Sequence, residues 1–544
     1  MKRILKVFAM VSFMALPALV HAGGIMTNTN QSASYIRLLV LDAVIGPEGA
    51  YYNPAGLSFL QDGFHLSVSN QSILQKRTIQ TTFPMNRGEF EGTVSAPLFP
   101  SVYAVYKTGS LAFSLGVNPI GGGGSALFEE GLPSFEQQVA VLPAGLQAAG
   151  INTTQYGLST RFDAQSLFWG VQATASYALN DMLSAAVGFR YVTARNTYDG
   201  YLNDIMINPD LRGHPQLGAL GAIYSGSMTS APAFFGTLAG VLQEQVNILS
   251  GVAGSLQPFI SGGLGSATLS QALQGGYLTE AQVMQISGGI LQLNPQLDPS
   301  AMTLQQIQGF YAGAAQGFDD QRQEMEALQA MTSNREVSVT QTGSSFTPIF
   351  GVNLRLSDRV NLAVKYEHKT PLTVVNETET DGTGLYPDGV ETAQNLPAML
   401  SVGGQFGLTD KLTLHTGVHY YFDKSADYGK ARPNDEIIDK NFWEAGLGLE
   451  YRISPMFLVS AGYLRTQTGI NDLYHSDISH SLSTNTFGGG LRMQLNDMIA
   501  LNLGGLYSHY IQHTKAYSMP GGISWSETYD RSNMVFAVGV DLKI

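Results

Sequence analysis

Apolar and polar side chains alternate along much of the chain. In the stretch FWEAGLGLEYRI, Trp443 and every second residue after it are apolar, whereas Glu444 and every second residue after it are glycine or charged. The same alternation occurs in MVFAVGVDLKI at the end of the chain and in LTLHTGVHYYF and SLFWGVQATASYAL further upstream. A period of two is the pattern of a β-strand with one apolar face. We therefore expect a chain built mainly of strands.

The alternation predicts fourteen strands. Short polar turns such as 180–181 and 454–455 join pairs of them, while the opposite connections are long and irregular. This asymmetry is typical of an outer-membrane barrel, which has tight periplasmic turns at one end and long external loops at the other. The predicted strands cover residues 64–75, 101–107, 111–119, 166–179, 182–196, 347–356, 359–370, 398–408, 412–422, 442–453, 456–466, 486–495, 498–510 and 533–544.

A large soluble β-sandwich or propeller also has alternating strands, and the signal of any one segment is weak. An even number of strands, however, suits a closed barrel. No segment after the N-terminal leader offers about 18 uninterrupted apolar residues, the length that a membrane-spanning helix needs. Since only helices and closed sheets satisfy every backbone group in lipid, a membrane location would require a barrel. We expect an all-β membrane protein, a 14-stranded antiparallel transmembrane β-barrel.

The chain begins with the features of a secretory signal peptide. Three Lys and Arg residues precede an apolar stretch over residues 7–20 and a small-residue cleavage site that ends at Ala22. We therefore expect residues 1–22 to be removed on export and the barrel to lie in the outer membrane of a Gram-negative bacterium. The chain has no cysteine, which excludes lipoprotein processing, disulfides and thiolate metal sites.

Composition narrows the range of partners. Charged residues make up only 13% of the chain, which holds 61 glycines, 25 tyrosines and 26 phenylalanines. That balance is unusual for a cytosolic enzyme and ordinary for a barrel that faces lipid. The chain has 29 basic and 42 acidic residues, and removal of the leader with its three basic residues leaves a net charge of −16. This negative charge argues against nucleic acid as a partner.

The segment that precedes the first predicted strand is too apolar for a solvated tail. Its last part, EGAYYNPAGLSFLQDG, contains a compact turn at Asn53-Pro54-Ala55-Gly56, with tyrosines before it and Leu57, Phe59 and Leu60 after it. Packed inside the barrel, the segment would be a plug. We expect a hatch over residues 23–62.

These residues resemble the FadL family of outer-membrane transporters for long-chain fatty acids and hydrocarbons, including its TodX-type members. A leader, a segment that closes in NPAGL and fourteen strands follow one another as in that family. Its N-terminal hatch carries an Asn-Pro-Ala motif, which Asn53, Pro54 and Ala55 match. Strand-turn-strand units similar to those of the family in order and spacing lie at 179–195, 351–372, 396–422 and 441–463.

The resemblance implies passive transport of hydrophobic compounds, with long-chain fatty acids as the first candidate. It implies extracellular capture, binding in the lumen of the barrel formed by residues 63–544, and lateral exit into the bilayer. We expect a monomer in contact with outer-membrane lipid, with no catalytic residue and no cofactor. One feature departs from the family: the chain ends in Ile544, whereas the family commonly ends in an aromatic residue that serves as an assembly signal.

The third predicted strand has an unusual end. In LGVNPIGGGGSALF, Pro119 is followed by Gly121 to Gly124. Proline cannot donate to the ladder of a sheet and consecutive glycines resist a flat strand, so we expect the wall to break or bend here. The resemblance implies a lateral gate at such a kink, and we assign it to Gly116, Pro119, Gly121 and Gly122, with the hatch turn packed beside it. The simpler alternative is the start of a flexible external loop.

The alternation also predicts which charged residues face the lumen. We expect most of them to form an internal network that holds the hatch. Arg190 and Lys440 lie toward the external ends of their strands and are our candidates for binding a carboxylate, because Arg and Lys suit that task. The predicted lumenal set is Arg190, Arg355, Lys365, His415, His419, Lys440, Glu444, Glu450, Arg452 and Arg492.

Two long connections are expected outside the membrane, a loop at 120–160 and a partly helical insertion at about 200–340. Between Leu211 and Gly317 few residues are charged, and stretches such as FFGTLAGVLQEQVNIL have helical spacing. These helices either bury their apolar faces on one another as a cap or leave an exposed apolar groove that receives ligand. The two arrangements can coexist.

Other functions have less support. The chain has no Gly-x-Ser-x-Gly elbow, His-Glu-x-x-His or phosphate-binding loop motif, so no motif proposes an enzyme. His415 and His419 share a strand face, but no third metal ligand is apparent. An open porin and a haem or surface receptor remain as alternatives. The sequence does not choose among fatty acids, aromatic hydrocarbons and other lipophiles.

Overall fold

The computed structural model describes residues 32–214, 219–519 and 523–544. The predicted leader lies outside the described residues. Contacts divide the chain into two compact units. Within the described residues, the barrel unit holds 32–140, 159–203 and 335–544, and the helical unit holds 141–158 and 204–334.

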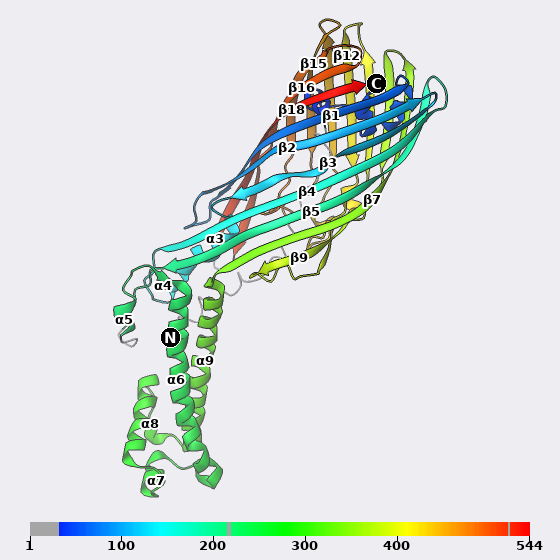
Figure 1. Cartoon of the computed structure of the whole chain (residues 1–544). Coiled ribbons are helices and arrows are strands. Elements are labelled where there is room, and N and C mark those ends of the chain that lie inside the picture. The colour runs from blue at the N-terminus through cyan, green and yellow to red at the C-terminus, as the bar shows by residue number, and fades with distance from the viewer. Residues whose placement is uncertain (1–31, 215–218, 520–522) are drawn as a thin grey trace. The chain divides into compact units, whose positions relative to one another are not determined.

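The strands form one antiparallel sheet that closes into a barrel, because β1 pairs with both β2 and β18 (Figure 1). β8 and β9 share one position in the wall, as do β16 and β17, while β6 and β10 are short additions; the barrel therefore has fourteen positions, as predicted. The strands are β1 (Gly63–Thr81), β2 (Glu89–Thr108), β3 (Leu111–Phe128), β4 (Tyr156–Ala178), β5 (Leu183–Ile207), β6 (Thr229–Ser230), β7 (Arg335–Ser357), β8 (Val360–Glu367), β9 (Thr373–Asp381), β10 (Glu391–Ala393), β11 (Met399–Gly407), β12 (Leu412–Tyr421), β13 (Trp443–Arg452), β14 (Phe457–Gln467), β15 (Thr484–Gln494), β16 (Ile499–Tyr510), β17 (His513–Met519) and β18 (Ile523–Lys543).

Several strands are longer than the alternation predicts. β2 begins at Glu89 rather than at 101, and β3 continues to Phe128. The connection between β3 and β4 is therefore shorter than the predicted 120–160 loop, and it contains α3 (Pro133–Ala140) and α4 (Leu142–Ala148). Likewise the insertion between β5 and β7 begins after Ile207 and ends before Arg335.

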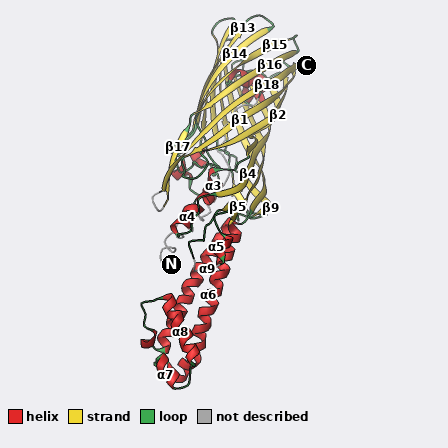
Figure 2. Cartoon of the chain, turned by 90° about the vertical axis from the view of Figure 1, so that its left-hand side faces the viewer, coloured by secondary structure: helices red, strands yellow, loops and turns green. Residues whose placement is uncertain are grey.

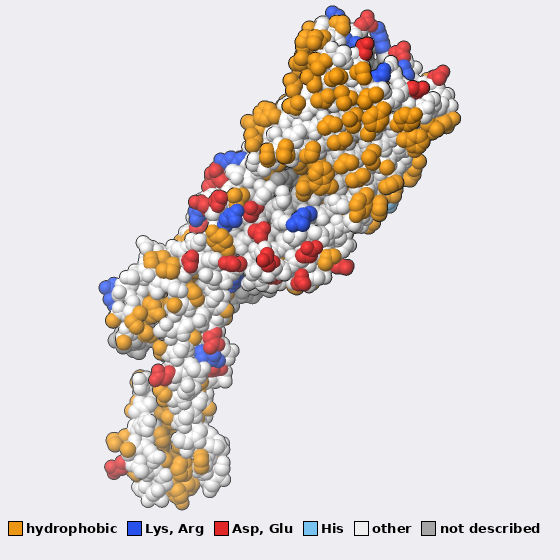
Figure 3. All heavy atoms as spheres, in the orientation of Figure 1, with side chains coloured by type: hydrophobic (Ala, Val, Ile, Leu, Met, Phe, Trp, Pro, Cys, Tyr) orange, Lys and Arg blue, Asp and Glu red, His pale blue; other side chains and the backbone are white. Residues whose placement is uncertain are grey.

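The outer face of the barrel is apolar. Leu447, Leu449 and Tyr451 on β13 are 54%, 45% and 46% exposed, whereas Glu444 on the other face of the strand is 1% exposed. A band of apolar side chains covers the wall, and charged side chains gather at its borders (Figure 3). None of the helices in the described part of the chain is long and apolar enough to cross a membrane.

The N-terminal segment forms three short helices, α2 (Ala33–Leu38), η2 (Pro47–Ala50) and η3 (Pro54–Phe59). Ser32 caps α2 by accepting a hydrogen bond from the Tyr35 amide, and every residue of α2 is buried. The segment contacts strands from both halves of the chain, including β1, β2, β3, β7 and β13 to β16. It therefore occupies the interior of the barrel.

The helical unit is dominated by two long helices, α6 (Ala231–Phe259) and α9 (Leu304–Thr332), which lie side by side (Figure 2). Its other helices are α5 (Leu220–Ile223), η5 (Ile260–Leu264), α7 (Leu269–Gln274), α8 (Glu280–Leu293) and η6 (Pro299–Ala301). Leu256, Ile290 and Ile307 are fully buried in a shared apolar cluster. The helices thus pack their apolar faces against one another, the first of the two arrangements expected for the insertion.

Candidate functional site

A glycine-lined part of the barrel wall receives the N-terminal segment. A Cβ atom at Gly462 on β14 would lie 2.1 Å from the carbonyl oxygen of Leu38, and one at Gly488 on β15 would lie 2.5 Å from that of Ile36. Only glycine permits such a close approach of two backbones. Glycines at inward positions of consecutive strands are therefore a sequence signal for the hatch. The prediction of the lumenal face from charged residues does not use this signal.

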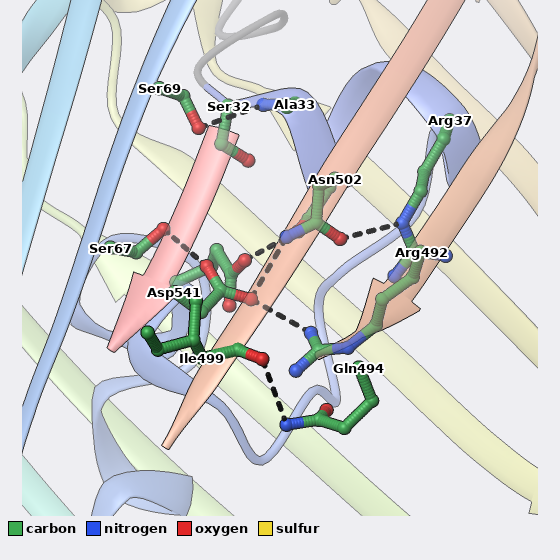
Figure 4. Close-up of polar contacts among 12 residues, drawn as sticks. Ser32, Ala33, Arg37, Ser67, Ser69, Arg492, Gln494, Ile499, Asn502 and Asp541 are labelled. Atoms are coloured by element: carbon green, nitrogen blue, oxygen red, sulfur yellow. Dashed lines mark hydrogen bonds and ion pairs between the residues drawn. The ribbon is translucent and has the colours of Figure 1, made fainter. Parts of the chain in front are cut away.

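Arg37 of α2 is the main ionic anchor of the hatch. Its Nη1 atom lies 2.6 Å from Oε1 of Glu450 and 3.0 Å from Oγ of Ser460. Its Nε atom donates a hydrogen bond to Oδ1 of Asn502 at 3.2 Å. Asn502 in turn donates to Asp541, which also accepts from Arg492 at 2.8 Å (Figure 4). The predicted lumenal residues Glu450 and Arg492 thus belong to a network that joins the hatch to the wall.

His419 forms a second anchor. Its Nε2 lies 2.6 Å from Oδ1 of Asp42 in the hatch, and its Nδ1 lies 3.1 Å from Oε2 of Glu444. His415 instead contacts Oε2 of Glu450 at 3.0 Å. The two histidines that share this strand face therefore contact different carboxylates.

The Asn-Pro-Ala-Gly turn begins η3. The side chain of Asn53 accepts a hydrogen bond from the Gly56 amide and donates to Oδ1 of Asn353 on β7 at 2.8 Å. Gly56 has no room for a side chain, since a Cβ would lie 2.4 Å from Nδ2 of Asn53. The carbonyl oxygen of Ala55 accepts from Oγ of Ser184 on β5 at 2.7 Å. The motif thus fixes the hatch to two strands, and η3 also contacts β3.

A chain of aromatic rings connects the hatch to the third strand. Tyr51 and Tyr52 meet edge to face at 5.0 Å between ring centroids, and Tyr51 lies 6.4 Å from Tyr103 on β2. Gly116 on β3 lies against Tyr103, because a Cβ there would be 3.2 Å from its ring. A larger residue at Gly116 would push this ring toward the hatch.

Pairing in the wall is interrupted between β2 and β3. Val94 pairs with Ala126 and Val102 with Val117, and the register shifts between these two pairs. We call the intervening residues, 95–101 of β2 and 118–125 of β3, the β2–β3 seam.

The third strand does not end at residue 119, as the alternation predicts, although the wall is irregular here. β3 runs on through Pro119 and the four glycines because it keeps its pairing with β4, with register shifts at Pro119/Gly121 and Gly123/Ser125. Gly122 has φ +79°, and a Cβ there would lie 1.9 Å from the carbonyl oxygen of Ser166. The irregularity is therefore an interruption of the pairing with β2 along one edge of β3, and Gly121 and Gly122 belong to the strand rather than to an external loop.

Arg190 is buried, and its guanidinium forms an ion pair and several hydrogen bonds. Its guanidinium donates to both carboxylate oxygens of Glu367, at 2.6 and 2.9 Å, and to Oε1 of Gln172. It also lies 4.7 Å from the centroid of the Tyr51 ring. Lys440, by contrast, is exposed and precedes β13 rather than facing the lumen from a strand. The structure does not bring the two candidates for carboxylate binding together.

Comparisons with known proteins identify the fold. No family model and no curated protein matches the sequence. The crystal structure of a Pseudomonas aeruginosa FadL homologue is similar, with a TM-score of 0.54 at 12% identity over 96% of this chain and 100% of that one. The chain has the FadL-type fold. The Pseudomonas putida toluene transporter TodX gives a TM-score of 0.51 at 12% identity, over 96% and 100% of the two chains.

In this FadL-type barrel, side chains of the wall also hold the backbone of the hatch. The Tyr51 carbonyl accepts from Nζ of Lys365 at 2.9 Å, and that of Ala50 accepts from Nε2 of Gln172 at 2.6 Å. The site therefore consists of a plug held by hydrogen bonds, an aromatic contact and an irregular seam in the wall.

Proposed function

We propose that the protein is an outer-membrane transporter that admits hydrophobic compounds, with long-chain fatty acids as the first candidate. In this proposal a lipophile is captured outside, enters the lumen above the hatch and leaves sideways into the bilayer through the β2–β3 seam. The interrupted pairing at this seam, next to the hatch, is the observation that carries the proposal. A regular wall at this position would leave the bilayer inaccessible from the lumen.

Residues at the seam have the chemistry that such an exit needs. Leu98 on β2 is 78% exposed, Phe99 is buried, and Pro97 and Pro100 lack the amide hydrogen that a regular ladder uses. Pro119 and Ile120 on the facing strand are also apolar and buried. An apolar passage lets a lipophile move from lumen to bilayer without meeting water.

The helical unit is the candidate for capture. Its exposed surface carries apolar side chains, among them Ile223, Tyr277 and Met284 at 64%, 52% and 67% exposure. A contiguous exposed apolar patch often marks a binding site, and we assign capture to such a surface of this unit. Each methylene of an alkyl chain buried on such a surface contributes about 0.8 kcal/mol.

An engineered disulfide tests the seam, and the absence of native cysteine makes the test clean. Regular continuation of the Val94 and Ala126 pairing would place Ser95 opposite Ser125. We expect that Ser95→Cys with Ser125→Cys, once oxidised, lowers uptake of labelled oleate toward that of cells without a transporter, and that reduction restores it.

The matched control is Leu447→Cys with Tyr463→Cys, because these residues are paired partners on the regular wall between β13 and β14. Oxidation of this pair should leave uptake unchanged. Uptake that continues when the disulfide between positions 95 and 125 has formed would refute exit through the seam. Parallel uptake of labelled toluene decides whether neutral hydrocarbons share the route with fatty acids.

A further inference from the structure

A groove of about 580 Å³ lies in the wall of the barrel over β11, β12 and β13. Strand pairing aligns part of its lining in one row across the sheet, which consists of Gly404, Thr416, Leu447 and Tyr463. Leu447 is 54% exposed, so this row belongs to the outer face that meets lipid. The small side chains of the row, together with Ala445 beside it, leave the space that the larger side chains surround.

The groove opens toward the lipid and not toward the lumen. Hatch residues fill the inner face of the same strands. A Cβ at Gly417 would lie 2.1 Å from Oδ2 of Asp42, and one at Gly446 would lie 2.6 Å from Cγ2 of Val40. The groove is therefore separate from the interior of the barrel and from the route proposed for a transported compound.

Aromatic side chains mark the external end of the groove. Tyr420 and Trp443 are paired partners on β12 and β13, and they are 39% and 37% exposed. Tyrosine and tryptophan concentrate where the apolar band of a barrel meets the lipid head groups. Trp443 begins β13, and the short turn at 454–455 follows the other end of this strand. The groove thus reaches the external border of the apolar band.

Arg465 on β14 stands at this border and also lines the groove. It pairs with Ala445, and its neighbours Leu464 and Thr466 are buried on the inner face, so its own side chain is on the outer face. Its guanidinium donates to Oδ1 of Asn485 at 3.3 Å and to Oε1 of Gln467 at 2.7 Å. Both of these acceptors in the described chain are neutral amides, which leave the positive charge without a counterion.

The charge and the shape of this surface favour a lipid over a protein partner. The groove residues that the structure describes include no carboxylate. A second copy of the chain related by two-fold symmetry would bring the same surface, and hence a second arginine of this kind, to the interface. A lipid phosphate supplies the missing negative charge at the level of the head groups, while an acyl chain below it covers the apolar groove. Arginine matches a phosphate with planar, paired donors.

We propose that this groove is a specific binding site for a phosphorylated lipid of the external leaflet, with an acyl chain along the groove and a phosphate on Arg465. In an outer membrane that leaflet is rich in lipid A, a glycolipid that carries phosphates and several acyl chains, and we assign this lipid to the site. The inference goes beyond transport, because the groove lies on the opposite side of the wall from the β2–β3 seam.

Native mass spectrometry of the purified full-length protein in detergent tests the site with two probes, lipid A and lipid A freed of its phosphates. Arg465→Gln should weaken the binding of lipid A by about tenfold and leave the binding of the dephosphorylated lipid unchanged. Ala445→Leu fills the groove and should weaken the binding of both lipids. Heat-modifiable migration on a gel checks that each variant has folded.

Each variant has a matched control on the outer face of another part of the barrel. Arg195 on β5 is exposed, and its neighbours Ala194 and Asn196 are buried, so Arg195→Gln removes an outward charge away from the groove. Ala175 on β4 pairs with Phe113, which is 49% exposed, so Ala175→Leu enlarges an outward side chain away from the groove. Both controls should bind lipid A like the wild type.

Three results would overturn the site. The first is undiminished lipid A binding by the Arg465→Gln variant, and the second is equal binding of the two probes by the wild type. The third is an equal loss in the Arg195→Gln variant, which would indicate general attraction between the barrel and anionic lipid. Binding of phosphatidylglycerol that is as tight as that of lipid A would overturn the assignment to the glycolipid.

The proposed transport function is judged separately, by uptake of labelled oleate into cells. The Arg465→Gln variant should take up oleate like the wild type, because the substitution leaves the hatch and the seam intact. Absence of uptake in the wild type would end the transport proposal and leave the lipid site to the binding measurement.

Discussion

Single glycines on the inner wall decide whether the hatch fits. Gly462→Val places a side chain where a Cβ would already lie 2.1 Å from the Leu38 carbonyl oxygen. We expect a loss of about 1–3 kcal/mol in hatch packing, the usual cost of overfilling a packed interior. The barrel itself should still assemble, because the strand pairing does not involve the side chain. Larger and more frequent openings in planar-bilayer conductance would report the displaced hatch.

Ala461 offers the control for this prediction, since it neighbours Gly462 but lies on the exposed outer face. Ala461→Val should conduct like the wild type. A Gly462→Val variant with the same conductance as the wild type would show that the hatch tolerates the extra volume and that the glycine lining is not required.

Arg37 supplies a second prediction at the scale of one side chain. Arg37→Met removes the partner of Glu450 at 2.6 Å and the donor to Asn502. Loss of one member of a buried ion pair costs about 3–5 kcal/mol, so the hatch should become susceptible to protease while the barrel resists. Lys76→Met is the control, because Lys76 pairs with Glu91 on the exposed surface and such pairs contribute little. Equal proteolysis of both variants would contradict the assigned role of Arg37.

The sequence predicts which way a side chain faces, but not which partner it meets. Alternation places Arg190, Glu444 and Glu450 inward, and the structure agrees: Arg190 and Glu444 are buried, and Glu450 contacts Arg37 of the hatch. It does not predict that Arg190 meets Glu367, because that contact depends on the register of strands far apart in the chain. The alternation also predicts an inward position for Lys440, which is wrong: Lys440 lies in the exposed segment before β13, where side chains do not alternate between two faces of a sheet.

Among the elements, strand number was predictable and strand length was not. The alternation of β1 is clear where one face meets lipid and the other the lumen, and it predicts a strand that ends at residue 75. β1 continues to Thr81 through Lys76 and Arg77. Outside the lipid both faces of a strand can be polar, so the period of two disappears although the hydrogen bonds continue.

The loop at 471–483 should respond to acid. The His475 ring stacks on His513 at 4.0 Å between centroids, and burial with the charges of His513 and Lys515 lowers the pKa of His475 from 6.5 to about 3. The pKa of His480 is also lowered, mainly by burial. At His475 the opened loop binds more protons than the packed loop between about pH 3 and pH 6.5, so the contribution of this residue to packing is complete above that window and is lost as pH falls through it.

Hydrogen exchange of the loop, corrected for the intrinsic effect of pH, measures this weakening. His475→Gln removes a titrating group and should reduce the acid response, whereas His368→Gln alters an exposed histidine and should leave it unchanged. Exchange in the wild type that is as slow at about pH 4.5 as at about pH 7.5 would rule out the histidines as acid sensors.

For the whole molecule, the two units allow capture and passage to be separated. Leu202 on β5 pairs with Arg335 on β7, so Asn-Gly in place of residues 203–334 would close the strands with a two-residue hairpin turn. The barrel should fold, because every position of its wall and the whole hatch remain. We expect uptake of oleate to fall at low concentration, where capture limits the rate, and to approach the wild-type rate at saturating concentration, where exit through the seam limits it. A variant with wild-type uptake at all concentrations would remove the helical unit from capture, whereas loss of the saturating rate in a folded barrel would show that the unit also serves passage.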